Sequence, residues 1–72
     1  MGKADRQNGQ IKNIVNEKGF GFITPEHGDT EFFFHYTGLV GVTLDQLRQG
    51  TRVTFIASSG PKGPRAERIE LV

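Results

Sequence analysis

Hydrophobic side chains recur along this chain in short runs with a period of two, which is the pattern of β-strands. The runs are rich in β-branched and aromatic residues, and clusters of glycine, proline and aspartate separate them. Several strands this short are typical of a small all-β sandwich or barrel. The pattern predicts five strands, over residues 10–15, 18–24, 31–36, 51–58 and 65–71.

Turn and helix signals lie between the predicted strands. Residues 25–29 form a turn, and residues 58–64, which contain two glycines and two prolines, form a longer loop. Between the third and fourth strands, Thr43 and Gln46 have the spacing of a capping box, in which each side chain satisfies a backbone N–H of the other residue. We therefore expect one short helical turn there.

The first residues of the chain differ in pattern from the rest. Residues 1–8 are polar and aperiodic, which predicts a flexible tail ahead of a single domain over residues 9–72. A chain of 72 residues buries only about 60% of its unfolded surface. Its core is therefore too thin to enclose a ligand cavity, and any partner is expected to bind on the outside.

Side chains alternate between the two faces of a strand, so the third strand has a solvent-exposed face and a buried face. Phe32 and Phe34 share one face. Glu31, Phe33 and His35 share the other, and the charged residue marks it as solvated. Phe33 is therefore an aromatic ring on a solvated surface. Packing in the core explains an inward ring, whereas an exposed ring needs another explanation.

The second strand repeats this arrangement. Lys18, Phe20 and Phe22 share its outer face, and Tyr36 lies at the rim of the neighbouring strand. Two adjacent strands thus present aromatic rings outward, and we infer a surface aromatic platform.

The opposite faces supply the predicted core. In the first strand, Ile11 and Ile14 are three residues apart and break the period of two, which either a β-bulge or strong coiling of the strand explains. The predicted core residues are Ile11, Ile23, Phe32, Phe34, Leu44, Leu47, Val53, Phe55, Ile69 and Leu71.

Charge and composition exclude several classes of protein. Nine Lys and Arg against eight Asp and Glu give a net charge of +1, so phosphates can be bound only locally. The absence of Cys excludes disulfides and thiolate zinc sites, and His27 and His35 alone do not make a metal site. We found no signal peptide, membrane span, paired carboxylates, activated nucleophile or phosphate loop. We expect a cytoplasmic monomer without catalysis, cofactor, membrane contact or small-molecule substrate.

Aromatic rings on a sheet surface can stack with unpaired nucleobases, because every base has a π-face. Gly19 and Gly21 flank Phe20 and let the strand curve sharply. Residues 18–22 match the first five positions of the ribonucleoprotein consensus K/R-G-F/Y-G/A-F. Basic side chains placed to follow the phosphates are Lys12, Lys18, Lys62 and Arg65.

These motifs together resemble a known family. Lys18-Gly-Phe-Gly-Phe-Ile23 and Phe33-Phe-His-Tyr36 are similar to the two ribonucleoprotein motifs of the cold-shock domain, and residues 60–66 resemble its last loop. The resemblance implies a five-stranded antiparallel OB-fold barrel that binds single-stranded RNA and DNA. It also implies an RNA chaperone that regulates transcription and translation in the cold. The candidate nucleic-acid-binding residues are Lys12, Asn13, Lys18, Phe20, Phe22, Phe33, His35, Tyr36, Lys62 and Arg65.

This chain departs from the family at three positions. Asn13 and Ile14 replace aromatic residues after the first lysine, and Leu44 replaces an exposed phenylalanine. The missing stacking sites, at about 1–3 kcal/mol each, predict weaker binding and a shorter footprint. Asn13 alternatively donates a hydrogen bond to a base edge.

A second function uses the same surface. A small β-barrel with exposed aromatic rings also suits a module that binds a protein or the ribosome. The lysines interleaved with the rings favour nucleic acid.

Overall fold

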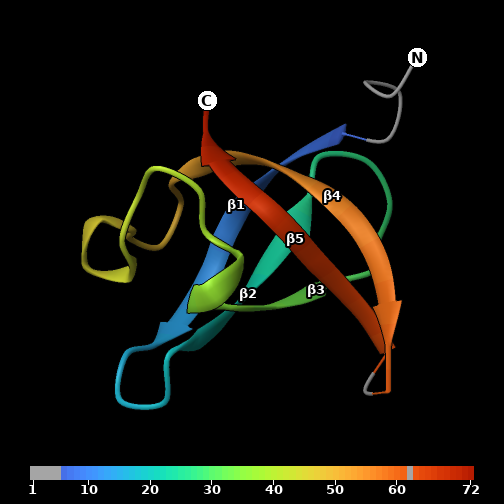
Figure 1. Cartoon of the computed structure of the whole chain (residues 1–72). Coiled ribbons are helices and arrows are strands. Elements are labelled where there is room, and N and C mark those ends of the chain that lie inside the picture. The colour runs from blue at the N-terminus through green and yellow to red at the C-terminus, as the bar shows by residue number, and fades with distance from the viewer. Residues whose placement is uncertain (1–5, 62) are drawn as a thin grey trace.

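Five strands close into a barrel in the computed structural model, which describes residues 6–61 and 63–72 (Figure 1). The strands follow the order β1-β2-β3-β5-β4, and β4 pairs with β1 to complete the ring. This confirms the predicted all-β, five-stranded barrel. The strands are β1 (Arg6–Val15), β2 (Phe20–Pro25), β3 (Phe32–His35), β4 (Arg52–Gly60) and β5 (Gly63–Leu71).

One strand pair runs against the prediction of a purely antiparallel barrel. β3 and β5 are parallel and meet where Phe33 pairs with Arg65. The connection between β3 and β4 crosses the barrel and places β4 beside β1 instead of beside β3. β5 then returns antiparallel to β4 and fills the position beside β3, where it runs parallel to that strand. All other pairs in the ring are antiparallel.

β1 begins four residues earlier than predicted. Arg6, Gln7 and Asn8 pair with β4, from Ile56 to Thr54, so the tail prediction is wrong for residues 6–8. Residues 1–5 lie outside the described residues. Backbone hydrogen bonds of a ladder do not require alternating hydrophobic side chains, which is why this polar segment gave no strand signal.

Residues 58–64 were predicted as a loop, and this is wrong for most of them. β4 continues to Gly60 and β5 starts at Gly63, and these two glycines pair directly. The φ angle of Gly63 is +109°, a conformation that side chains other than glycine rarely adopt. The segment is therefore a tight hairpin. The predicted site residue Lys62 lies outside the described residues.

The Arg6 side chain ties three strands together. Its Nη1 donates hydrogen bonds to Thr54 Oγ1 at 2.9 Å and to the carbonyl oxygen of Arg68 at 3.0 Å. Its Nη2 lies 3.6 Å from Glu70 Oε2. β1 is thereby linked across β4 to β5 at the closing seam of the barrel.

Alternation placed most of the core correctly. Eight of the ten predicted core residues are buried, whereas Leu44 is only partly buried and packs against the core. Leu71 is 50% exposed, so its placement in the core is wrong: it is the last residue of β5, beyond the buried Ile69. Val42 and Ala66 are additional buried residues.

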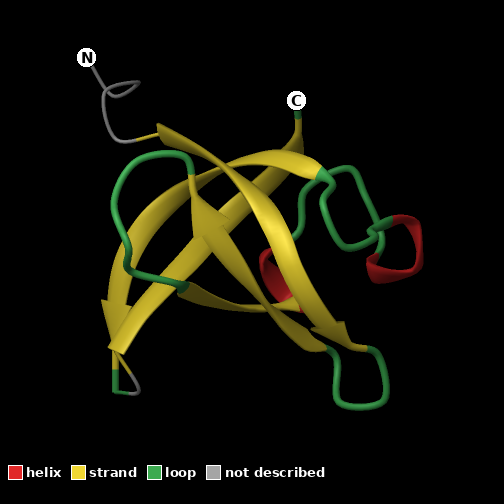
Figure 2. Ribbon diagram, turned by 180° about the vertical axis from the view of Figure 1, so that it is seen from behind, coloured by secondary structure: helices red, strands yellow, loops and turns green. Residues whose placement is uncertain are grey.

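Two short 3-10 helices, η2 (Tyr36–Gly38) and η3 (Leu44–Gln46), lie between β3 and β4 (Figure 2). η3 confirms the predicted helical turn, and Gln46 Oε1 accepts a hydrogen bond of 2.9 Å from the Thr43 backbone N–H. Within the described ranges, the structure has no helix of the length and apolar character that crossing a membrane requires.

Each of two strands carries a β-bulge. On β1 the register shifts between Ile11 and Asn13, which makes Lys12 the extra residue and confirms the bulge as the cause of the broken period. On β5, Arg68 and Ile69 together oppose Phe55 of β4. A bulge redirects the side chain of the extra residue, and both extra residues here are basic and exposed.

Candidate nucleic-acid interface

A row of side chains crosses four strands on the outer face of the barrel. Asn13 of β1 pairs with Phe22 of β2, which pairs with Phe33 of β3, which in turn pairs with Arg65 of β5. Paired residues of neighbouring strands project on the same face of a sheet. The row therefore places two aromatic rings side by side, with an amide at one end and a guanidinium at the other.

Phe20 joins the two rings of this row. Its ring centroid lies 6.0 Å from that of Phe22 and 5.5 Å from that of Phe33, and the last two centroids are 6.0 Å apart. The three rings contact one another and are half-buried. Mutual packing fixes their positions while leaving part of each ring accessible, which is the arrangement that stacking with a ligand requires.

His35 and Tyr36 extend this surface beyond Phe20. His35 pairs with Phe20, and its ring centroid lies 4.5 Å from that of Tyr36 with the planes 35° apart. His35 Nδ1 lies 3.0 Å from Thr37 Oγ1, which orients the imidazole. The aromatic platform, as we use the term below, consists of Phe20, Phe22, Phe33, His35 and Tyr36.

Tyr36 is 55% exposed and begins η2, so the prediction that it ends the third strand is wrong by one residue. Its ring lies over Gly19. A Cβ atom on that glycine would come within 2.6 Å of Tyr36 Cδ2, and the φ angle of Gly19 is +74°. The Tyr36 backbone N–H also donates to the Gly19 carbonyl oxygen at 2.8 Å. Gly19 thus sets the position of the outermost ring.

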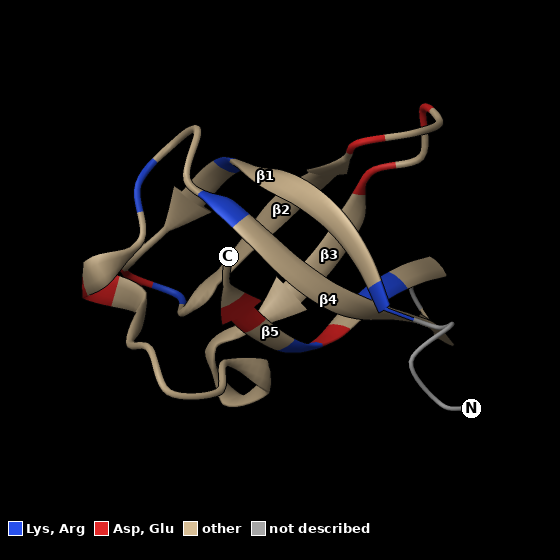
Figure 3. Ribbon diagram, turned by 90° about the horizontal axis from the view of Figure 1, so that it is seen from above, with Lys and Arg blue, Asp and Glu red and all other residues tan. Residues whose placement is uncertain are grey.

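Lys12 is exposed at the bulge of β1, beside the row that begins at Asn13. Its Nζ forms an ion pair with Glu31 Oε2. Glu31 belongs to the loop between β2 and β3, where Glu26 and Asp29 are also acidic (Figure 3). Sequence reasoning missed this partner, because nothing in the order of residues shows that the bulge turns Lys12 toward the loop.

The other predicted basic residues have different positions. Lys18 lies in the turn between β1 and β2, where the Val15 carbonyl oxygen accepts from its backbone N–H at 3.1 Å, so it is not the first residue of a strand. Arg65 ends the row of paired residues, and its Nε lies 3.7 Å from Glu67 Oε2. The structure therefore brings Lys12, Asn13 and Arg65 to the platform.

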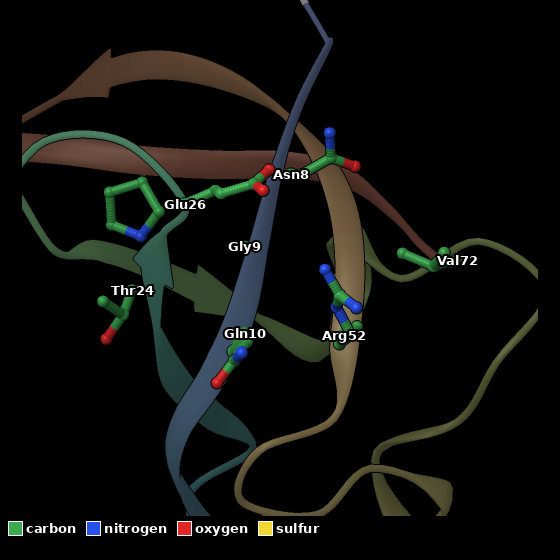
Figure 4. Close-up of a pocket in the computed structure, with 8 residues that line it drawn as sticks. Asn8, Gly9, Gln10, Thr24, Glu26, Arg52 and Val72 are labelled. Atoms are coloured by element: carbon green, nitrogen blue, oxygen red, sulfur yellow. The ribbon is translucent and has the colours of Figure 1, made fainter.

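A groove lies away from the platform (Figure 4). It has a volume of about 460 Å³ and is formed by residues 8–10 of β1, residues 24–26 at the end of β2, Arg52 and Val72. Its two charged residues, Glu26 and Arg52, have opposite signs, and no aromatic ring lines it. This groove offers no stacking surface.

Comparison with known proteins agrees with this geometry. The family model of the 'Cold-shock' DNA-binding domain matches residues 7–72. Cold shock protein CapB of Pseudomonas syringae pv. tomato is 41% identical over 69 residues, which cover 96% of this chain and 99% of that protein. The major cold shock protein CspA of Pseudomonas aeruginosa is 39% identical over the same shares of both chains.

A solved structure shares the fold. Superposition on drosophila Unr CSD456 gives a TM-score of 0.77 at 25% sequence identity, covering 93% of this chain. This chain spans 26% of the length of that one. The barrel is therefore an OB-fold of the cold-shock type. The match over residues 7–72 and the identity to two cold shock proteins show that this chain belongs to the cold-shock domain family.

Proposed function

We propose that this protein binds single-stranded RNA and DNA by stacking unpaired bases on the aromatic platform. The observation that carries this proposal is the row from Asn13 through Phe22 and Phe33 to Arg65, which combines rings with polar side chains at both ends. Rings supply stacking of about 1–3 kcal/mol per base, and basic side chains contact the phosphates. Lys18, in the turn between β1 and β2, and Lys62 are the further proposed phosphate contacts.

The proposed role follows from the kind of binding. Stacking accepts any base, so the protein binds many sequences and favours the melted form of weak RNA hairpins. We propose that it acts in this way as an RNA chaperone that regulates transcription and translation, without catalysis and in the cytoplasm. A closed barrel has no free sheet edge for pairing with a second copy, which supports a monomer.

Competition between single and double strands tests this function. Labelled oligo-dT is bound to the protein, and unlabelled oligo-dT, oligo-U and duplex DNA of equal length compete, with fluorescence anisotropy as the measurement. We expect duplex to compete at least about tenfold less well, because paired bases do not expose their faces for stacking. Equal competition by duplex, or no binding of oligo-dT at low salt, would contradict the proposal and favour a protein or ribosome partner.

The ion pair between Lys12 and Glu31 predicts a gain of function. Glu31→Gln removes a carboxylate that competes with phosphate for the Lys12 ammonium. Both side chains are about half exposed, at 51% and 42%, so the pair itself contributes little to stability. We expect oligo-dT binding to tighten about two- to fivefold, and the slope of log K against log salt to steepen by roughly 0.7 for one added phosphate contact.

Glu70→Gln is the matched control for this variant. It changes the net charge equally, but Glu70 pairs with Arg6 at the closing seam. Its effect on binding should be smaller and its salt slope unchanged. If both variants tighten binding equally, net charge explains the effect and Lys12 has no particular part in it.

A further inference from the structure

A groove on the far side of Arg65 continues the surface of the platform. One hollow of about 290 Å³ lies between Phe33, His35 and the β4–β5 hairpin, and a second of about 330 Å³ lies between η2 and β5. His35 and Arg65 line both hollows. A strand that leaves the platform past these two residues therefore enters the second hollow, which we call the η2–β5 groove.

Three charged side chains of β5 line the η2–β5 groove, namely Arg65, Glu67 and Arg68. Charges of both signs follow one another along this strand (Figure 3). Glu67 faces Arg65 at 3.7 Å, so Arg68 adds a positive charge that this carboxylate does not neutralise. Thr37 supplies a hydroxyl group and Gly38 leaves its part of the wall open. The charged side chains thus give the lining a net positive charge beside the apolar Val40 and Ala66, unlike the aromatic platform.

Arg65 has donor capacity that the fold does not use. Its side chain is 38% exposed, but its Nε is buried and has no hydrogen-bond partner among the described residues. The 3.7 Å separation from Glu67 is too long for a hydrogen bond. An unpaired buried donor costs free energy, so the Arg65 guanidinium is free to turn toward a ligand oxygen in the groove, which would recover that cost.

Arg68 is held in a strained conformation at the same place. Its φ angle is +50°, and it is the only described residue other than glycine with a positive φ. Such backbone costs of order 1–3 kcal/mol, and glycine or asparagine adopts it more easily. Strain of this kind concentrates at functional sites. Here the bulge places a long cationic side chain in the wall of the η2–β5 groove. Glycine or asparagine would adopt this backbone conformation at lower cost but would carry no charge.

From these observations we infer that the η2–β5 groove binds the phosphate backbone of the single strand beyond the last stacked base, with Arg65 and Arg68 as its ligands. The inference rests on the proposed function. A guanidinium presents several N–H donors in a planar fork that matches phosphate oxygens. The groove lengthens a footprint that the loss of aromatic residues at positions 13, 14 and 44 shortens.

A length series of oligonucleotides tests this inference. Anisotropy with labelled oligo-dT of about three to ten nucleotides is measured for the wild type and for Arg68→Asn, a residue that tolerates the positive φ. For the longer oligonucleotides we expect Arg68→Asn to bind about three- to tenfold more weakly, with a salt slope shallower by roughly 0.7. The shortest oligonucleotides should bind both proteins alike, and the affinity of the variant should stop rising at a shorter length.

Arg52→Asn is the matched control. It removes the same charge from the groove of Figure 4, away from the platform, and should not change the length dependence. Thermal unfolding should show that Arg68→Asn is at least as stable as the wild type. If Arg68→Asn binds every length like Arg52→Asn while the wild type binds oligo-dT, the groove is not a phosphate site although the platform functions. If the wild type binds no oligonucleotide, both proposals fail.

Discussion

Replacing Phe20 and Phe33 together with alanine is expected to weaken the binding of oligo-dT at least about 30-fold. Each stacked base contributes about 1–3 kcal/mol, and a loss of 1.4 kcal/mol is a factor of ten in the dissociation constant. The two rings lie 5.5 Å apart between centroids and contact Phe22, so their loss also removes the packing that positions the third ring. Anisotropy at two salt concentrations measures the effect. The salt slope should stay the same, since neither residue contacts phosphate.

Leu71→Ala/Val72→Ala is the control for this double variant. These side chains are also apolar and exposed, at 50% and 77%, but lie at the end of the chain away from the rings. Binding by this control should match the wild type. The platform is not the binding surface if both double variants weaken binding equally, or if the phenylalanine variant, shown to be folded by circular dichroism, binds normally.

Gly21→Ala is expected to destabilise the barrel by about 3 kcal/mol. A Cβ atom at this position would lie 2.6 Å from the Asn13 carbonyl oxygen and 2.8 Å from two ring atoms of Phe34. Neither neighbour can move easily, because Asn13 belongs to the bulged strand and Phe34 is fully buried. Urea denaturation should show a lower midpoint with an unchanged m-value. The loss is a large fraction of the stability of a small domain.

Gly38→Ala separates this steric effect from the general effect of removing a glycine. The nearest atom to a Cβ at Gly38 is the Ala66 carbonyl oxygen at 3.7 Å, an ordinary van der Waals distance. We expect its free energy of unfolding to change by less than about 0.5 kcal/mol. Equal losses in the two variants would show that close contact at Gly21 is not the cause.

Sequence patterns predicted the local features of the fold and missed those that depend on distant parts of the chain. Alternation identified five strands, because one face of each packs into the core. It could not find the start of β1 at Arg6, whose pairing partner Ile56 lies on the distant strand β4. Nor did it show that Arg65 lies beside Phe33, since a parallel pair between β3 and β5 leaves no periodic signal.

The same distinction between local patterns and distant contacts applies to the predicted site residues. Phe20, Phe22 and Phe33 were inferred from alternation alone, and the structure places them together. The partners of the charged residues were beyond prediction. Lys12 meets Glu31 because of a bulge, and Arg68 lines a groove because its backbone adopts a positive φ. Both depend on backbone geometry that residue type does not specify.

The contacts of Arg6 at the closing seam also join parts of the chain that a ribosome makes far apart in time. Arg6 bonds with Thr54 and with Arg68, 48 and 62 residues further on, so β1 is synthesised long before its partner strand. β1, β2 and β3 can pair as soon as they emerge, because short connections join them. Ring closure must overcome the entropy of a long loop, so we expect it to be the slow step of folding. Until then one edge of β1 is unpaired, and this interval is when a nascent chain is most exposed to aggregation.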